Sequence, residues 1–154
     1  MAIHLLKPAL APLILRVGLA AILLYHGLLK LGHDAGTDWS PDLGIPPEIQ
    51  ALVAWVELLS GIAIALGALT RFAAFAIAVI QIGAIILVTG HKDFISLQRL
   101  GPETRGYRFV AVGWEYNFAI VVMCLTLLML GSGTWSLNSA ILRLWRSRRP
   151  TPAA

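Results

Sequence analysis

The chain has 154 residues, of which 58% are hydrophobic and 13% are charged. A soluble domain carries about 25% charged residues and a disordered chain is poor in hydrophobic ones, so this composition excludes both classes. The one cysteine excludes an intrachain disulfide, a CxxC redox pair and a cysteine-ligated metal cluster. At about 20 residues for each membrane crossing, the chain has room for four spans.

Four long apolar segments follow one another along the chain. The first is too long for the core of a signal peptide, and we expect it to be retained. Only Thr70 and Arg71 separate the second from the third, so these two should form a tight hairpin. Gly131 ends the fourth, because glycine accepts a helix-terminating conformation. The pattern predicts an all-α, integral membrane four-helix bundle with helices at about 9–31, 49–69, 72–89 and 110–130.

Four spans place the two longer connections, 32–47 and 90–107, on the same side of the membrane. The basic tail favours the cytoplasm for both termini, by the positive-inside rule, although the second connection is also basic. We interpret the tail, 139–154, as a short amphipathic helix on the inner leaflet that is attracted to anionic lipid. The alternative is a solvated end. Because most basic residues adjoin spans, the net charge of +4 does not indicate nucleic-acid binding.

Ionisable side chains within the spans are candidates for function, because charge is costly at membrane depth. His26 and Lys30 share one helical face, and Gly27 between them allows a neighbouring backbone to come close. Glu57 lies deep in the second helix and needs a cation, for which Lys30 is at a compatible depth. The pair either fixes the helix register or lines a polar pocket in the outer half of the bundle.

The fourth helix begins with a polar motif that has two interpretations. Glu115 near a helix amino terminus is favoured by the helix dipole, and Trp114 and Tyr116 favour the membrane interface. These residues, with Asn117, could also belong to the outer pocket. Gln81 is interpreted as a hydrogen-bonding residue between helices.

Two arginines, Arg16 and Arg71, occupy the inner half of the bundle, where we expect their side chains to extend to the headgroups. The spacing from Arg16 to Glu57 is close to the spacing from Arg71 to Glu115. This similarity is consistent with two hairpins related as a parallel repeat. Haem is not predicted: it would need two axial histidines, and only a pairing of His26 with His91 is conceivable.

Several motifs in this order resemble the DoxX family of small four-span membrane proteins of bacteria and archaea. The similarity covers about residues 10–140. It differs in the closing motif, which in the family often reads Gly-Pro-Gly and ends in aspartate. The matching segments are Arg16, Tyr25-His26-Gly27-Leu28-Leu29-Lys30, Glu57-Leu-Leu-Ser-Gly61, Thr70-Arg71-Phe-Ala-Ala, His91-Lys92-Asp93-Phe94, Gly113-Trp114-Glu115-Tyr116-Asn117 and Gly131-Ser132-Gly133-Thr134-Trp135-Ser136-Leu137-Asn138.

The resemblance implies a four-helix domain over 1–138, a basic cytoplasmic tail over 139–154 and a location in the bacterial or archaeal cytoplasmic membrane. Relatives include a thiosulfate:quinone oxidoreductase subunit, so we expect a membrane subunit of a quinone-linked oxidoreductase acting on thiosulfate or another small sulfur or thiol reductant. The alternatives are a noncatalytic scaffold of a larger complex and a small-molecule carrier. Expected partners are membrane lipid, a redox subunit and a second copy of the chain.

The expected site residues follow from the needs of quinone chemistry. A quinone needs proton donors beside its oxygens, cations for developing negative charge and aromatic walls. The catalytic candidates are His26, Lys30, Glu57 and Glu115. The quinone-binding candidates are Tyr25, Trp55, Trp114, Tyr116 and Asn117. Arg99, Arg105 and Arg108 are expected to attract an anionic substrate, Arg16 and Arg71 to have structural roles, and no metal is expected.

Overall fold

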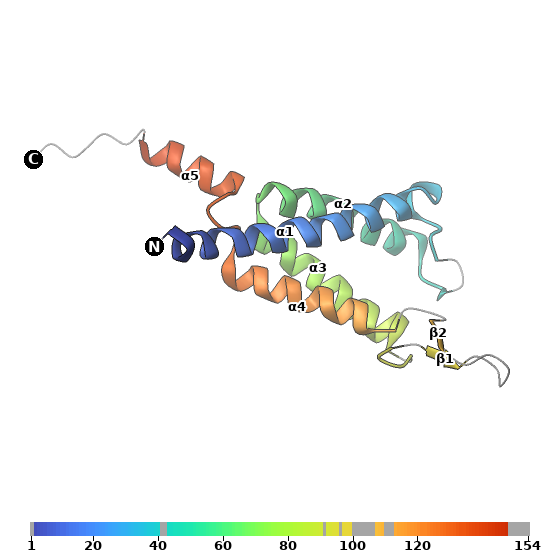
Figure 1. The fold of residues 1–154 in the computed structure, drawn as a ribbon. Coiled ribbons are helices and arrows are strands. Elements are labelled where there is room, and N and C mark those ends of the chain that lie inside the picture. The colour runs from blue at the N-terminus through green and yellow to red at the C-terminus, as the bar shows by residue number, and fades with distance from the viewer. Residues whose placement is uncertain are drawn as a thin grey trace, which may run out of the picture.

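The computed structural model describes residues 2–40, 43–90, 92–95, 97–99, 107–109 and 113–147; side chains are described at 10–40, 43–90, 92–95 and 113–147. Four helices form an antiparallel bundle and a fifth follows it (Figure 1): α1 Ala2–Leu31, α2 Pro47–Leu66, α3 Thr70–Ala84, α4 Glu115–Leu130 and α5 Leu137–Ser147. Within the described residues, Leu10–Leu31, Pro47–Leu66 and Thr70–Thr89 are long and apolar enough to cross a membrane, and α4 is a shorter apolar helix. The predicted helical membrane bundle is confirmed.

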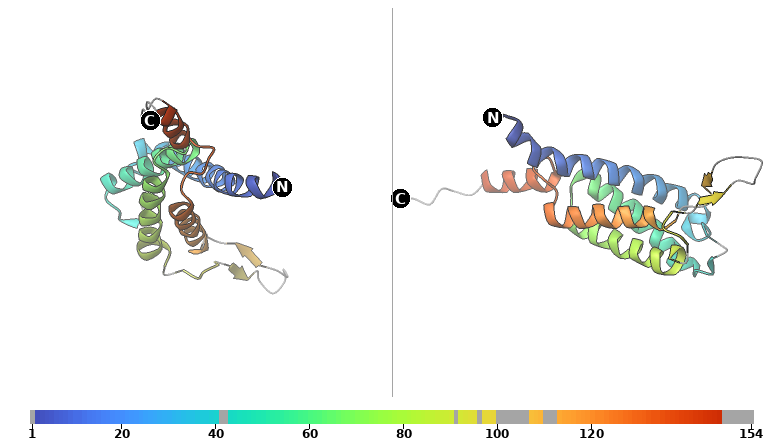
Figure 2. Two further views of the ribbon diagram at one scale, coloured as in Figure 1. Left: turned by 90° about the vertical axis from the view of Figure 1, so that its left-hand side faces the viewer. Right: turned by 60° about the horizontal axis from the view of Figure 1, so that its bottom comes forward.

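The two ends of the bundle differ in what they carry. The start of α1, the α2–α3 turn and α5 lie at one end, which we call the terminal end (Figures 1 and 2). The α1–α2 connection and the strands β1 and β2 lie at the other, the loop end. The two longer connections therefore share one side, as expected. α5 extends beyond the bundle at the terminal end rather than folding across it.

The helix boundaries depart from the predicted ones in three places. α1 begins at Ala2, before Pro8 and Pro12, rather than at about 9. The α2–α3 turn is Gly67–Leu69, so the predicted break at Thr70 and Arg71 is wrong: Gly67 takes the left-handed conformation (φ 70°) that ends α2. α4 begins at Glu115 rather than at 110.

The second connection contains structure that the sequence pattern did not predict. β1 Leu97–Arg99 and β2 Tyr107–Phe109 form a short antiparallel pair, with Gln98 opposite Arg108. Before it, α3 continues as a π-helical turn, Ile85–Thr89. π turns inside helices are frequently found at functional sites.

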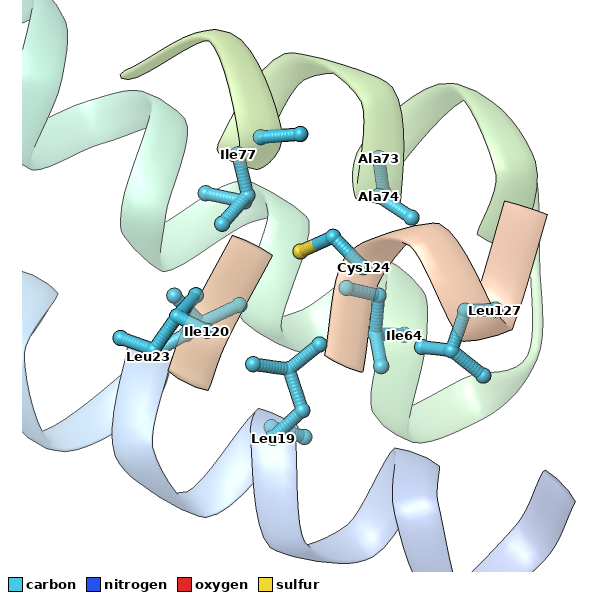
Figure 3. Close-up of a cluster of buried hydrophobic side chains, with 11 residues drawn as sticks. Leu19, Leu23, Ile64, Ala73, Ala74, Ile77, Ile120, Cys124 and Leu127 are labelled. Atoms are coloured by element: carbon cyan, nitrogen blue, oxygen red, sulfur yellow. The ribbon is translucent and has the colours of Figure 1, made fainter. Parts of the chain in front are cut away.

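Side chains from all four bundle helices meet in one apolar core (Figure 3). Cys124 of α4 lies at its centre and is completely buried. Two glycines bring α1 and α2 together: a Cβ on Gly27 would lie 2.7 Å from the backbone nitrogen of Leu58, and one on Gly61 would lie 3.1 Å from Leu24 Cγ. The predicted close approach at Gly27 is confirmed.

The two inner arginines have different surroundings. Arg16 is only 2% exposed, so the expectation that it extends to the headgroups is wrong. Its guanidinium donates to the carbonyls of Ile64 and Ala65, at the end of α2, and of Ser132 and Trp135, after α4, at 2.6–2.9 Å. These four carbonyl oxygens attract the cation inward, and those of Ile64 and Ala65 carry the partial negative charge of a helix end. Arg71 is exposed.

Candidate functional site

The loop-end half of the bundle encloses a cavity of about 360 Å³, which we call the loop-end cavity. All four bundle helices and the α1–α2 connection contribute to its wall. Its lining is mostly apolar, with a small number of polar groups. This is the usual composition of a small-molecule site. The polar and aromatic lining residues are His26, Lys30, Trp39, Glu57, Gln81, Thr89, Tyr116 and Asn117.

The predicted ion pair forms part of this wall. Lys30 Nζ lies 2.7 Å from both carboxylate oxygens of Glu57. The Lys30 side chain is 20% exposed and that of Glu57 is 4% exposed. Gly27 makes this geometry possible, because it allows α1 to cross α2 at backbone contact one turn before Lys30. The pair thus joins the two helices and also faces the cavity.

Trp39 covers the pair from the loop end, a role that the sequence reasoning missed. Lys30 Nζ lies 4.5 Å from the centre of the Trp39 ring, which is a cation–π geometry. Gln50 fixes the connection in place: its backbone carbonyl accepts from Trp39 Nε1, its side-chain oxygen accepts from the backbone nitrogen of Ser40, and its amide donates to Ile45. The α1–α2 connection is therefore a built wall of the cavity.

Three polar groups of the wall have no hydrogen-bond partner in the described structure. The Tyr116 hydroxyl is buried and unpaired. Gln81 is 5% exposed, and its side-chain amide makes no hydrogen bond. His26 makes ring contacts only, with the centres of Tyr116 and Tyr25 at 5.4 and 5.5 Å. Because an unmet buried polar group is costly, the Tyr116 hydroxyl at the cavity wall points to a ligand.

Asn117 and Thr89 behave differently from these three groups. Asn117 is buried, and its amide donates to the Thr89 hydroxyl at 3.1 Å. That bond joins α4 to the π-helical turn, which contributes Leu87, Val88 and Thr89 to the cavity. The π turn therefore helps to shape the wall.

Other predicted site residues lie outside the cavity lining. Tyr25 is 64% exposed and Trp55 is 48% exposed, both on the outer surface of the bundle. Trp114 packs against Phe94, with ring centres 4.5 Å apart. Glu115 is the first residue of α4, and its Oε2 is buried without a partner. Depth alone could not separate these residues from the cavity residues, because it does not specify which helix face points inward.

The predicted basic residues of the second connection are only partly described. Arg99 and Arg108 lie in β1 and β2, where the description covers the backbone. Arg105 and His91 lie outside the described residues. Among the described residues, no three histidine, cysteine, aspartate or glutamate side chains gather as a metal site.

The sequence model of the DoxX family, described as DoxX, matches residues 11–90, more than half of the chain. The matched segment runs from α1 to the end of the π turn. It includes the Lys30–Glu57 pair, His26 and Gln81, whereas α4 lies beyond it. No curated protein and no solved structure matches the chain.

Proposed function

Because this chain belongs to the DoxX family of membrane proteins, we propose that it is the membrane subunit of a quinone-linked oxidoreductase whose loop-end cavity holds the quinone head. The observation that carries the proposal is the buried Tyr116 hydroxyl, unpaired within the described residues, in the wall of an apolar cavity that Gln81 also lines. A quinone head is flat and apolar with carbonyl oxygens that accept hydrogen bonds. The Tyr116 hydroxyl and the Gln81 amide can both donate to such an oxygen.

The size and opening of the cavity favour a lipid-soluble ligand. Its volume of about 360 Å³ is within the range of small-molecule sites. Among its apolar lining residues, Ile49 of α2 is 48% exposed and Leu87 of the π turn is 78% exposed. In a membrane these side chains face acyl chains, so a quinone would enter between the loop-end halves of α2 and α3 while its tail stays in the bilayer.

Reduction of a quinone to a quinol takes two electrons and two protons. We assign proton donation to His26 and Tyr116, which both line the wall. Lys30 is the cation that stabilises negative charge developing on a quinone oxygen. The electrons come from a small sulfur reductant, such as two thiosulfate ions or two thiols that couple through a new S–S bond, or from a partner subunit.

The experiment measures quinone binding and turnover with the whole chain in lipid nanodiscs. The probes are decylubiquinone, with thiosulfate or a thiol as reductant. Gly83 lines the cavity, and a Cβ there would meet no atom within 4 Å, so Gly83→Leu should fill the cavity without disturbing the fold. Gly18→Leu in α1 is the matched control, because Gly18 is equally open but does not line the cavity.

We expect Gly83→Leu to abolish binding and turnover while Gly18→Leu retains both. Tyr116→Phe and Gln81→Leu should each weaken binding about 5- to 100-fold, as expected for one lost hydrogen bond in an apolar site. If decylubiquinone binds neither the native chain nor any variant, the proposal is wrong. Full activity of a co-purified partner enzyme with Gly83→Leu would instead support a scaffold role.

A further inference from the structure

A second pocket lies at the terminal end of the bundle, opposite the loop-end cavity. Its volume is about 530 Å³, and we call it the terminal-end pocket. Three segments that are distant in sequence form it: the start of α3, the end of α4 with the linker after it, and the start of α5. The lining residues that bear on a ligand are Leu69, Thr70, Arg71, Phe72, Gly131 and Asn138.

The amino terminus of α3 contributes unmet hydrogen-bond donors to this pocket. The residue before the helix, Leu69, is in the left-handed conformation (φ 49°), and no side chain caps the helix. The first turn is closed by the Ala73 nitrogen donating to the Leu69 carbonyl. The backbone N–H groups of Thr70, Arg71 and Phe72 precede that bond and have no intrahelical acceptor. A helix start with free N–H groups attracts anions.

The side chain of Thr70 is an independent sign of a ligand. Thr70 is 2% exposed and lines the pocket, yet its hydroxyl is buried without a hydrogen-bond partner in the described structure. A threonine at the start of a helix commonly uses its hydroxyl for capping, which this one does not. An acceptor oxygen in the pocket would satisfy it.

Arg71 supplies a cation whose donors are mostly unused. Its one hydrogen bond within the described residues, to the Met129 carbonyl, is long at 3.4 Å. The guanidinium lies against Gly131, with Arg71 Nε 3.6 Å from where a Cβ would be. Arg16 differs in this respect, since it makes four short bonds to carbonyls. Arg71 can therefore offer two parallel N–H groups to a phosphate.

The charge around the pocket favours an anion and the surface around it favours a lipid. None of the eight acidic residues falls in the segments that build the terminal end, 2–25, 60–75 and 125–147. Phe72 and Leu69, which adjoin the hydrogen-bond donors of Thr70 and Arg71, are 72% and 69% exposed. An anion site at the end of a span with exposed apolar side chains beside it can contact both the headgroup and the acyl chains of a lipid.

We infer that the terminal-end pocket binds the phosphate group of a membrane phospholipid. Arg71, the Thr70 hydroxyl and the free N–H groups of α3 hold the phosphate oxygens, and Asn138 lines the same pocket. Phe72 and Leu69 contact the acyl chains. The site is separate from the loop-end cavity, so it does not depend on the proposed quinone chemistry.

The test measures lipid binding to the detergent-purified chain by native mass spectrometry. The probes are phosphatidylglycerol, a diacylglycerol with the same acyl chains but no phosphate, and inorganic phosphate. The variants are Arg71→Gln, Thr70→Val and Asn138→Asp, which places a carboxylate in the pocket. Arg146→Gln is the control, because Arg146 is a basic residue of α5 that does not line the pocket.

We expect Arg71→Gln and Asn138→Asp to weaken phosphatidylglycerol binding about tenfold or more and Thr70→Val severalfold, since charge-assisted bonds to phosphate are the stronger ones. Arg146→Gln should stay within about twofold, because a distant surface charge contributes little. If Arg71→Gln alone fails to fold, the binding measured with Thr70→Val and Asn138→Asp tests the inference. Asn138→Asp keeps the bond of residue 138 to Gly67, because the backbone nitrogen makes it. The inference is overturned if Arg146→Gln and the pocket variants lose the same amount of binding. It is also overturned if diacylglycerol binds as tightly as phosphatidylglycerol, or if the chain responds to inorganic phosphate alone.

Discussion

Removing one partner of the Lys30–Glu57 pair should cost more than removing both. The Glu57 carboxylate is 4% exposed and Lys30 is its one ion-pair partner in the described structure. Lys30→Met therefore leaves an uncompensated charge in the bundle, at a cost of about 3–5 kcal/mol in the free energy of unfolding. The reverse change, Glu57→Met, leaves an ammonium that is 20% exposed and still contacts Trp39, so its cost should be smaller, about 1–3 kcal/mol.

The double variant Lys30→Met with Glu57→Met should recover most of this loss. Two apolar side chains of similar volume replace the pair, and such replacements are often neutral or stabilising. The expected order of stability is native and double variant together, then Glu57→Met, then Lys30→Met. Quinone binding should remain impaired in the double variant if Lys30 serves the ligand as well as the fold.

The chain carries its own probe for this measurement. Cys124 is the one cysteine, and it is completely buried in the core. A thiol-reactive fluorophore should label it only when the bundle opens, so the labelling transition in detergent or nanodiscs reports global unfolding. A double variant as unstable as Lys30→Met would refute the reasoning, because the cost would then come from lost packing rather than from a stranded charge.

Three further outcomes follow from the fold. Arg16→Gln should lower stability by about 2–4 kcal/mol and expose α5 to trypsin, because its bonds join the linker before α5 to the end of α2. Gly27→Ala should lower the free energy of unfolding by about 1–3 kcal/mol, because the new Cβ would meet the backbone of α2. Gly18→Ala, where a Cβ meets no atom, should cost nothing measurable. Equal losses of stability in the two variants would contradict the close helix crossing. Gln50→Leu should release the connection that holds Trp39, which faster hydrogen exchange at residues 37–40 and 43–45 would reveal. Unchanged exchange there would argue against this role.

The structure supports the arginine part of the internal repeat suggested by the sequence, but not the glutamate part. Arg16 bonds to carbonyls at the end of α2, and Arg71 bonds to one near the end of α4, so the first helix of each hairpin contributes an arginine to the end of the second. The glutamates are not equivalent, because Glu57 lies deep in α2 whereas Glu115 begins α4. Similar spacing in sequence did not mean equal depth, since α2 and α4 start at different distances from their glutamates.

The sequence by itself determined the properties that depend on composition and depth. Apolar segments long enough to cross a bilayer predicted the bundle. The cost of a buried carboxylate predicted that Glu57 needs Lys30, and the missing side chain of Gly27 predicted a close helix crossing. Each of these follows from one segment, or from two segments that must be at the same depth.

Only the tertiary structure decided which helix faces meet. Arg16 points inward and donates to four carbonyls, whereas Arg71, an arginine at similar depth, lines a pocket. Within the described residues, the tertiary structure left the Tyr116 hydroxyl unpaired at the loop-end cavity and the Thr70 hydroxyl unpaired at the other end. The physical reason is that an apolar span lacks the polar face that marks the outside of a soluble helix. Its inward face is set by packing against distant segments.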